Sequence, residues 1–587
     1  MESSVIRFTK DSDYVKYVND LLNKYHSSLS HQHIPLGQDF LSFDNELATE
    51  ALQLHRFINK FEIPSDEASS SRASSSLMDM LNYDSSGITT FNPGSDQVLS
   101  GSVRHILYNA KRTLSESIRS YSFSISNLEL TSGETYVSAR GDTSVYAKLR
   151  DIKQWTVTVN CFDLAARLFY NSPMLRNAAK YQFKKWFFAN YARMSGFNLT
   201  PKQAWEQYNA TLSTVVFDKS SESYGKVTNF TNREKYAIFC YKLRKIVTFV
   251  SGARLTTVPK NNETDRVIEC ECWLNMLVQR TIGISIKKVI KDHFEIDLEK
   301  SQDLHGKLIS DPTNATIDLK SASNSNWLAV VNWMLEGSLL SKHLNQARCG
   351  LVESNGEWHR MNMLSPMGNG FTFEVMTLML LSIGRELDSF CHVYGDDIVI
   401  DADVAPCFIE TVEYMGYKIN SSKTFLTGSF RESCGSFFCE GYITSYDLHY
   451  AEDIVDAIIL TNKIGIMGNT TNSGLANTWL NLHHELLELC PRNLLRGFNF
   501  RTLNHSNLEL FVPDLADGIL IDRRRLVKLR TKDLVWKTQH ENAVTDHLDL
   551  ILDLNYKPSS FSSYRYVKKV SKTYKDVDSS FSLEDVG

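Results

Sequence analysis

The segment His392-Val393-Tyr394-Gly395-Asp396-Asp397-Ile398-Val399-Ile400 places two adjacent carboxylates between two short apolar runs. The apolar runs predict two strands, and Gly395 has the backbone freedom that a tight turn between them requires. The turn would present two negative charges at the tip of a hairpin. Adjacent acids repel each other, so a bound cation is one explanation for the pair. Ordinary turn chemistry, in which Asp is common, is the other.

A third acid stands upstream, where the β-prone run Ala315-Thr316-Ile317 reaches Asp318. Small and polar residues follow it and lead into an apolar helix. A strand holds such an acid in place while the next loop leaves it accessible, which is a common setting for a metal ligand. Capping of the helix is the alternative role, but Ser323 and Asn324 are also placed for it.

Two further stretches have the composition of a phosphate-binding site. Arg254, Lys260 and Arg266 occur at intervals along an extended, β-branched segment, and cations on rigid backbone suit a triphosphate. A solvated hairpin is the alternative for this segment. The run Ser365-Pro366-Met367-Gly368-Asn369-Gly370 precedes a predicted helix that ends near residue 386, and its glycines permit close approach of the backbone to a ligand.

Two basic stretches are candidates for RNA contact. Residues 523–532 carry six cations and no acid, so phosphate contact and a solvated surface are both open. Residues 181–193 mix aromatic and basic side chains, which suits single-stranded RNA, but an amphipathic helix with a basic outer face is the favoured interpretation.

Composition limits the class of protein. The chain has 587 residues, of which 42% are hydrophobic, so a sizeable core and more than one domain are expected. A net charge of −5 excludes a generally basic nucleic-acid coat. Cys270 and Cys272 form a C-x-C pair, but no second pair lies nearby in sequence to complete a zinc site, so free thiols are expected. No apolar run reaches membrane-spanning length, and a soluble intracellular protein is expected.

The remaining chain is expected to be largely helical, with linkers. Residues 1–62 show apolar residues at helical spacing, including Leu47 and Leu52, and the chain beyond about residue 450 also reads as helical. The Ser-rich stretch 69–76 and the Gly/Ser/Pro-rich stretch 85–102 are both interpreted as loops or linkers.

The order of these motifs resembles the palm of RNA-dependent RNA polymerases. Within that class, the wording of Val258-Pro259-Lys260-Asn261, of residues 367–374, of residues 394–398 and of Phe430-Arg431-Glu432-Ser433-Cys434-Gly435 is similar to the replicase β subunit of the leviviruses, the small positive-strand RNA bacteriophages. The resemblance covers residues 254 to 445. It implies an α+β fold of the right-hand polymerase type, with fingers, palm and thumb and an antiparallel palm sheet flanked by helices. The implied division is an N-terminal helical region with linkers (1–102), fingers with the basic run 254–266 (103–310), a palm with a fingers insertion at about 335–362 (311–445), and a thumb with the C-terminal region (446–587).

The resemblance also implies the reaction and its residues. Two Mg²⁺ ions, for which Mn²⁺ substitutes, would serve nucleotidyl transfer from NTPs to the 3′-hydroxyl of RNA on a single-stranded RNA template, with release of pyrophosphate. The implied catalytic residues are Asp318, Asp396, Asp397 and Lys423, the three acids being the metal ligands; the NTP-binding residues are Arg254, Lys260, Arg266, Asn324, Ser365, Gly368 and Asn369; and Arg523, Arg524, Arg525, Lys528 and Arg530 would bind RNA.

One position departs from the family pattern, and two other functions compete. Asn324 stands where the family has a second Asp, which removes a charge but keeps a hydrogen-bonding group for a ribose 2′-hydroxyl. A reverse transcriptase shares the palm, but the small residues Ser323 and Ser325 favour ribonucleotides. An RNA-binding structural protein would use the acids only as turn residues. The family implies bacterial host partners, namely elongation factors Tu and Ts and a small-subunit ribosomal protein, and a location in the cytoplasm of the infected bacterium.

Overall fold

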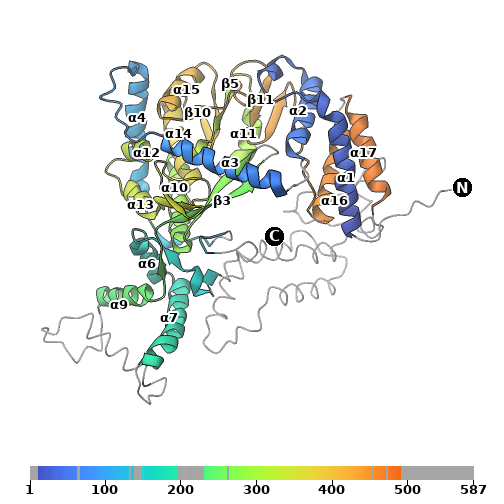
Figure 1. Ribbon diagram of the computed structural model, residues 1–587. Coiled ribbons are helices and arrows are strands. Elements are labelled where there is room, and N and C mark those ends of the chain that lie inside the picture. Colours follow the sequence, from blue (N-terminus) through green and yellow to red (C-terminus); the bar gives the residue numbers. More distant parts are fainter. Residues whose placement is uncertain are drawn as a thin grey trace, which may run out of the picture.

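A four-stranded antiparallel sheet, here called the central sheet, lies in the upper part of the view in Figure 1, between α15 and α2. The computed structural model describes residues 11–61, 66–130, 134–137, 148–149, 151–194, 203, 205, 231–260, 264–452, 454–470 and 474–490. The strand order is β10-β5-β9-β8. The strands are β5 (Asn314–Lys320), β8 (His392–Tyr394), β9 (Asp397–Asp401) and β10 (Lys418–Ile419). The hairpin predicted around Gly395 is therefore confirmed as β8 and β9.

Helices cover the central sheet because its strands are apolar on both faces. Ile398, Val399 and Ile400 are successive residues of β9, and all three are buried. Helix α14 (Thr372–Leu387) packs against β8, and it is buried around nearly its whole circumference between the sheet, α4 (Gly101–Ser117), α10 (Trp273–Phe294) and α15 (Ala405–Tyr414). The expected α+β class, with an antiparallel sheet flanked by helices, is confirmed.

A second four-stranded sheet has the order β4-β3-β6-β7. Its strands are β3 (Ala253–Pro259), β4 (Asp265–Cys270), β6 (Leu351–Ser354) and β7 (Glu357–Arg360). The β3–β4 and β6–β7 pairs are antiparallel, whereas β3 and β6 are parallel. The sheet thus joins the predicted basic segment to residues about one hundred positions further along the chain.

Helix α3 (Asp66–Ser85) corrects the prediction that the Ser-rich stretch 69–76 is a linker. Serine has weak helical preference, but tertiary contacts override it here. The Arg72 guanidinium pairs with the Asp265 carboxylate at 2.7 Å, and both side chains are almost fully buried. The Ser76 hydroxyl accepts a hydrogen bond from the Asp265 backbone amide at 3.0 Å. Composition alone therefore failed to predict this helix, because α3 is stabilised by contacts with Asp265 at the start of β4. The second predicted linker is confirmed, since residues 86–100 are irregular.

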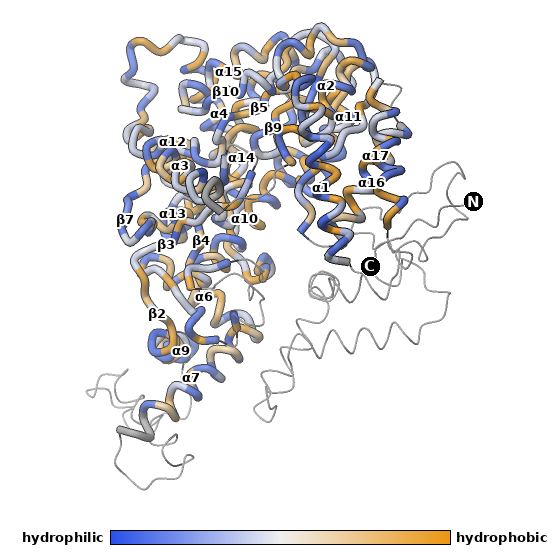
Figure 2. The backbone as a smooth tube through the Cα atoms, turned by 45° about the vertical axis from the view of Figure 1, so that its right-hand side comes forward, coloured by the Kyte–Doolittle hydropathy of each residue, from blue (hydrophilic) through white to orange (hydrophobic). Residues whose placement is uncertain are grey.

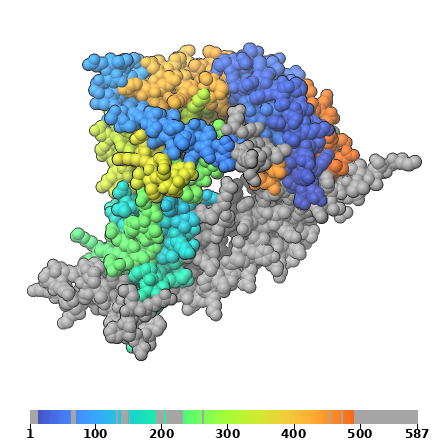
Figure 3. All heavy atoms as spheres, viewed as in Figure 1, coloured from blue at the N-terminus to red at the C-terminus, as the bar shows by residue number. Residues whose placement is uncertain are grey.

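The N-terminal helices pack against helices from the far end of the described chain (Figures 1 and 3). Helices α1 (Asp11–Leu29) and α2 (Asn45–Lys60) share one apolar cluster with α16 (Ile454–Thr470) and α17 (Ala476–Glu488). Figure 2 shows that α16 is largely hydrophobic, as its position between neighbours requires. Within the described residues both regions are helical as expected, although Leu47 lies 42% exposed outside the cluster. Residues 491–587 lie outside the described part of the chain.

The other elements complete the chain. Helix α7 (Pro173–Met194) contains the aromatic and basic residues 181–193. Phe183 and Phe187 are buried while Lys185 is exposed, as an amphipathic helix requires at these positions. With α6 and α9 it forms the lower part of the molecule in Figure 1. The remaining main elements are β1 (Thr156–Val157), α6 (Phe162–Asn171), α7 (Pro173–Met194), α9 (Asn232–Arg244), β2 (Thr248–Phe249), α11 (Ser301–Leu308), η6 (Ala322–Ser325), α12 (Leu328–Met334), α13 (Leu339–Ala347), β11 (Phe430–Ser433) and β12 (Ser436–Cys439).

Candidate functional site

The central sheet brings three acids together. In the antiparallel pairing of β5 with β9, Asp318 lies opposite Asp397. Asp396 occupies the turn between β8 and β9, next to Asp397. Asp318 and Asp396 are 78 positions apart in the sequence, and strand pairing alone brings them together. The three acids form one cluster at the end of the two inner strands, β5 and β9.

The surroundings of this cluster disfavour an uncompensated negative charge. Burial raises the pKa of Asp318 to about 6, the charges of Asp396 and Asp397 add to the rise, and Lys423 and Asn420 oppose it. Burial, followed by the charge of Asp396, also raises the pKa of Asp397. Asp396 itself is exposed. A cation bound at the exposed edge would stabilise the ionised form of all three acids.

Gly395 sets the shape of the turn that carries Asp396. Its φ of +66° lies in the left-handed region, which favours glycine. A Cβ at this position would lie 2.6 Å from the ring of Phe373, which packs edge-to-face on Tyr394. The Gly395 amide donates a hydrogen bond to the Thr377 hydroxyl at 3.0 Å. Contacts with Phe373 and Thr377 of helix α14 therefore fix the position of the turn.

Gly395→Ala is expected to destabilise the protein by about 2 kcal/mol more than Gly356→Ala. Both glycines have positive φ, but a Cβ at Gly356, in the β6–β7 turn, meets nothing within 4 Å. The difference isolates the overlap with Phe373, because overpacking costs roughly 1–3 kcal/mol. Urea unfolding of the two variants measures it, and equal losses would show that the turn yields without strain.

Lys423 lies beside the acids on a turn that follows β10. The Asn420 amide donates to the Asp318 carbonyl at 2.9 Å, and the Asn420 side chain donates to the Asp318 carboxylate. The Lys423 amide in turn donates to the Asn420 carbonyl. The Lys423 ammonium is 3.6 Å from the buried Glu432 carboxylate on β11. Asp318 and Lys423 are thus tied together through Asn420.

Three residues that shape this site were not predicted from the sequence to have a functional role. Burial raises the pKa of Glu432 to about 7, although Lys423 opposes the rise. Glu432 stands in the quoted run 430–435 but was given no role. Asn420 was also unassigned. Gln38, the first residue of the short 3-10 helix η2 (Gln38–Ser42) before α2, donates from its side chain to the carbonyls of Ser421 at 2.8 Å and Thr424 at 2.9 Å. Nothing local in the sequence marks Gln38, because its contact spans almost four hundred positions.

Two of the three predicted triphosphate-binding cations lie near the acids. Arg266 pairs opposite Val258, beside the end of β3 that leads to Lys260. Burial lowers the pKa of Lys260, the charges of Arg266 and Lys423 lower it further, and Asp318 opposes them, so these charges are close. Arg254 is six residues back along β3, roughly 20 Å away. It faces Glu134, with the charged atoms 3.8 Å apart.

The predicted nucleotide-pocket residues are mostly engaged with the protein. The Ser365 and Thr372 hydroxyls are 2.6 Å apart, and the Asn369 side chain donates to the Glu271 carboxylate at 2.7 Å. Gly368 has a φ of +108° and lies so close to Glu269 that a Cβ would be 2.5 Å from its carbonyl oxygen. Asn324 is half-buried in η6 and does not cap α12, whose N-cap is Trp327 without a side-chain hydrogen bond.

The predicted RNA-binding residues lie outside the described part of the chain. They are Arg523, Arg524, Arg525, Lys528 and Arg530.

A buried histidine pair supports β8 beneath the acids. His305 Nε2 is 3.1 Å from His392 Nδ1, and His305 Nδ1 is 2.7 Å from the Ser433 hydroxyl. Burial lowers the pKa of His305 to about 3, and the charge of His392 adds to the effect. Burial, followed by the charge of Arg385, lowers the pKa of His392 to about 4. Both rings are therefore neutral at pH 7.

Stability is expected to fall as the pH drops below about 6.5. In that range the unfolded histidines gain protons while the folded ones stay neutral, so unfolding takes up protons and acid favours it. Each histidine contributes a slope of about 1.4 kcal/mol per pH unit, down to its folded pKa. His305→Gln should therefore flatten the pH dependence of the urea unfolding free energy by about that slope. His31→Gln, at an exposed position, is the control. An unchanged slope in His305→Gln would contradict the neutral pair.

Comparison with known proteins identifies the chain. An antiparallel sheet flanked by helices, with acids paired across β5 and β9, agrees with the α+β polymerase fold that the sequence predicts. A family model described as "RNA replicase, beta-chain" matches residues 226–577, and the chain belongs to this family. Its similarity to the RNA-directed RNA polymerase beta chain of Enterobacteria phage fr is 31% identity over 300 residues, which cover 48% of this chain and 53% of that protein.

Other relatives show the same level of similarity. The beta chain of Escherichia phage MS2 is 32% identical over 42% of this chain and 47% of its own length. The subunit beta of Escherichia virus Qbeta is 33% identical over 36% of this chain and 38% of its own length. The chain thus spans about half the length of the curated relatives that it matches first. The solved RNA-dependent RNA polymerase of a human picobirnavirus is 12% identical, with a TM-score of 0.29, over 74% of this chain and 90% of that chain. None of the described helices is long and apolar enough to span a membrane.

Proposed function

We propose that the chain is an RNA-directed RNA polymerase, which joins NTPs to the 3′-hydroxyl of growing RNA on a single-stranded RNA template. The observation that carries the proposal is the pairing of Asp318 with Asp397, with Asp396 in the adjoining turn and Lys423 alongside. Membership of the RNA replicase β-chain family supports it, as do the names of the phage relatives. The competing reading as a structural RNA-binding protein gives no reason to bury two acids side by side.

The three acids suit Mg²⁺, with Mn²⁺ as a substitute. Carboxylate oxygens are the ligands that Mg²⁺ prefers. Burial and mutual repulsion raise the pKa values of Asp318 and Asp397, and a divalent cation offsets both effects. Asp318, Asp396 and Asp397 would hold two such ions. When bound, the ions supply activation of the 3′-hydroxyl and neutralisation of the triphosphate charge.

The basic residues would act on the triphosphate and on the leaving group. Lys260 and Arg266 would bind its phosphates, while Arg254 would act further along β3. In the reaction, the 3′-oxygen forms a bond to the α-phosphorus and the bond to pyrophosphate breaks. Lys423 would give its proton to the departing pyrophosphate. Burial lowers the pKa of Lys423, but Glu432 and the three acids raise it by more, so it carries that proton at neutral pH.

The remaining predicted residues would position the nucleotide and the RNA. Ser365, Gly368 and Asn369 would shape the loop beside the nucleotide rather than contact it with free side chains, since Ser365 and Asn369 are buried and hydrogen-bonded. Asn324 would meet the ribose 2′-hydroxyl. The basic residues between 523 and 530 would contact RNA phosphates.

The proposal extends to host partners and location. Elongation factors Tu and Ts and a small-subunit ribosomal protein would assemble with the chain in the cytoplasm of the infected bacterium. If they are required, RNA synthesis by the purified chain will increase when extract from uninfected bacteria is added.

Incorporation of labelled UMP tests the proposed activity. The purified chain is mixed with a short C-ended RNA, four NTPs and Mg²⁺, with and without bacterial extract, and acid-insoluble product is counted. Supplying dNTPs in a parallel reaction tests the reverse transcriptase alternative. RNA product that requires both the template and the intact acids supports the proposal. Absence of product under both conditions, from a folded chain, would contradict it.

A further inference from the structure

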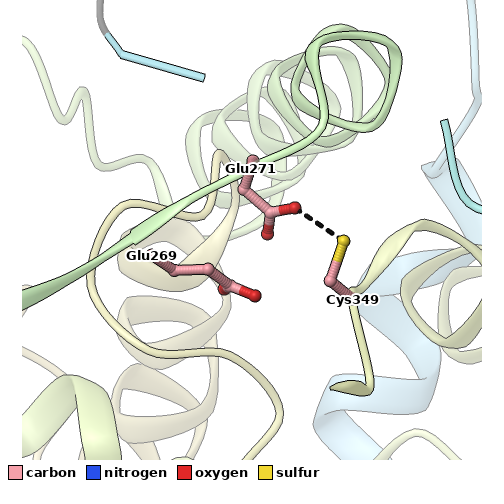
Figure 4. A group of neighbouring side chains, drawn as sticks. All are labelled: Glu269, Glu271 and Cys349. Atoms are coloured by element: carbon pink, nitrogen blue, oxygen red, sulfur yellow. Dashed lines mark hydrogen bonds between the residues drawn. The ribbon is translucent and has the colours of Figure 1, made fainter. Parts of the chain in front are cut away.

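Three buried side chains meet where the end of β4, the start of α10 and the segment before β6 come together. They are Glu269, Glu271 and Cys349, and each is no more than 2% exposed. Figure 4 shows the two carboxylates and the thiol pointing toward one another. One oxygen of each carboxylate and the sulfur all lie within 4.8 Å of one another. The Cys349 thiol donates to Glu271 at 3.0 Å.

Glu269 is the unexplained member of this cluster. Neither of its carboxylate oxygens accepts a hydrogen bond from an N–H or O–H group in the described part of the chain. Its close polar neighbour is the carboxylate of Glu271, and two carboxylates can bond only by sharing a proton. The nearby Arg348 guanidinium donates instead to the backbone carbonyls of residues 361, 363 and 364.

The charges in the cluster therefore need compensation. Both carboxyl groups are buried side by side, and no hydrogen-bond donor in the described part of the chain reaches the Glu269 oxygens. A buried carboxylate pair is stable only with a shared proton or with a bound cation. The Cys349 thiol beside the pair adds a third ligand group, and a thiophilic metal ion accepts both sulfur and carboxylate oxygen.

We propose that Glu269, Glu271 and Cys349 bind one structural Zn²⁺ ion. Zinc accepts both thiolate sulfur and carboxylate oxygen, whereas Mg²⁺ disfavours sulfur. The sulfur of Cys272 is 4.0 Å from that of Cys349, but it donates to the Gly252 carbonyl at 3.4 Å and lies outside the group of three. Binding releases the thiol proton of Cys349 to solvent. Cys270 of the C-x-C pair faces Glu134 and takes no part in the cluster, whose sulfur comes from Cys349 in a distant segment.

The ion would join three segments on the side of the second sheet. Glu269 and Glu271 end β4, Cys349 precedes β6, and Glu271 accepts a hydrogen bond from Asn369 in the loop before α14. Zinc bound by Glu271 would thus stabilise the position of that loop next to β4 through the hydrogen bond from Asn369. This role goes beyond the proposed polymerase function, because metal binding is measured without RNA synthesis.

The zinc content of the full-length chain is the direct test. Protein produced with added zinc and dialysed without chelator is expected to contain about one zinc per chain by mass spectrometry. Cys349→Ser and Glu269→Gln should each reduce that content by roughly tenfold or more. Cys391→Ser is the matched control, because Cys391 is equally buried but lies outside the cluster, and it should retain the metal. Cobalt-substituted protein should show thiolate-to-cobalt charge-transfer absorption, which Cys349→Ser abolishes.

Two results would overturn the proposal. A folded wild-type chain without zinc would mean that the carboxyl pair shares a proton. Zinc that persists in a folded Cys349→Ser variant would lie elsewhere. If the variants fail to fold, X-ray absorption of the wild-type zinc decides the question, since a shell without sulfur contradicts the site and a mixed sulfur and oxygen shell supports it.

Discussion

Replacing Asp318 by asparagine is expected to lower the rate of nucleotide incorporation by roughly 10³-fold, which corresponds to about 4 kcal/mol of transition-state stabilisation. The substitution preserves the shape of the side chain but removes the charge opposite Asp397. Asparagine at this position also retains a carbonyl oxygen for the Asn420 side chain. The fold should therefore survive while the metal affinity falls. Steady-state incorporation of labelled UMP, with circular dichroism as a check of folding, measures the effect.

Asp401→Asn is the matched control for this experiment. Asp401 is also an acid in the β5–β9 pair, but it lies opposite Asn314 at the other end of β9. Asparagine there keeps an acceptor for the Asp403 amide. Incorporation should stay within about twofold of the wild-type rate. Equal loss in both variants would mean that the pairing is structural, and equal activity in both would remove Asp318 from the reaction.

Trp479→Ala is expected to destabilise the chain by about 4 kcal/mol. Trp479 is fully buried in α17, its indole N–H donates to the Gln53 side chain at 2.7 Å, and its ring packs edge-to-face on Phe57. Removal of a buried tryptophan costs roughly 3–5 kcal/mol through lost burial of apolar surface and the cavity that remains. It also leaves the Gln53 acceptor without its buried donor. Urea unfolding measures the change in unfolding free energy.

Trp358→Ala controls for the loss of a tryptophan. Trp358 lies on β7 and is 43% exposed, so its removal should change the unfolding free energy by only about 0.5 kcal/mol. A Trp479→Ala variant as stable as Trp358→Ala would show that α2 and α17 do not share a core.

What the sequence predicts depends on how far apart the interacting residues are. The hairpin at Gly395 follows from local signals, because a glycine between two apolar runs suffices. The pairing of Asp318 with Asp397 is set by strand register, which no local signal in the sequence specifies. Only the resemblance to a family implied that these acids meet. Helix α3 was missed because Asp265, almost two hundred residues away, holds it.

The same reason explains the site residues that were missed. Gln38 and Glu432 have ordinary sequence surroundings and acquire their roles only when folding places them beside Lys423. Glu269 and Cys349 are likewise brought together by the second sheet. The division of the chain into four regions stays a prediction.

The shared cluster of α1, α2, α16 and α17 also determines when α1 can complete its packing during synthesis of the chain. The Tyr14 hydroxyl donates to the Leu486 carbonyl, across 472 positions of the chain. On the ribosome, α1 is made first but has to wait for α17 before its apolar face is covered. Gln38 lies between α1 and α2, but its segment packs in a separate apolar cluster against residues 425–443, so the turn that carries Lys423 gains this support once those residues are made. A nascent chain that stops before α17 therefore leaves the apolar face of α1 partly uncovered, although the support that Gln38 gives to this turn is already in place.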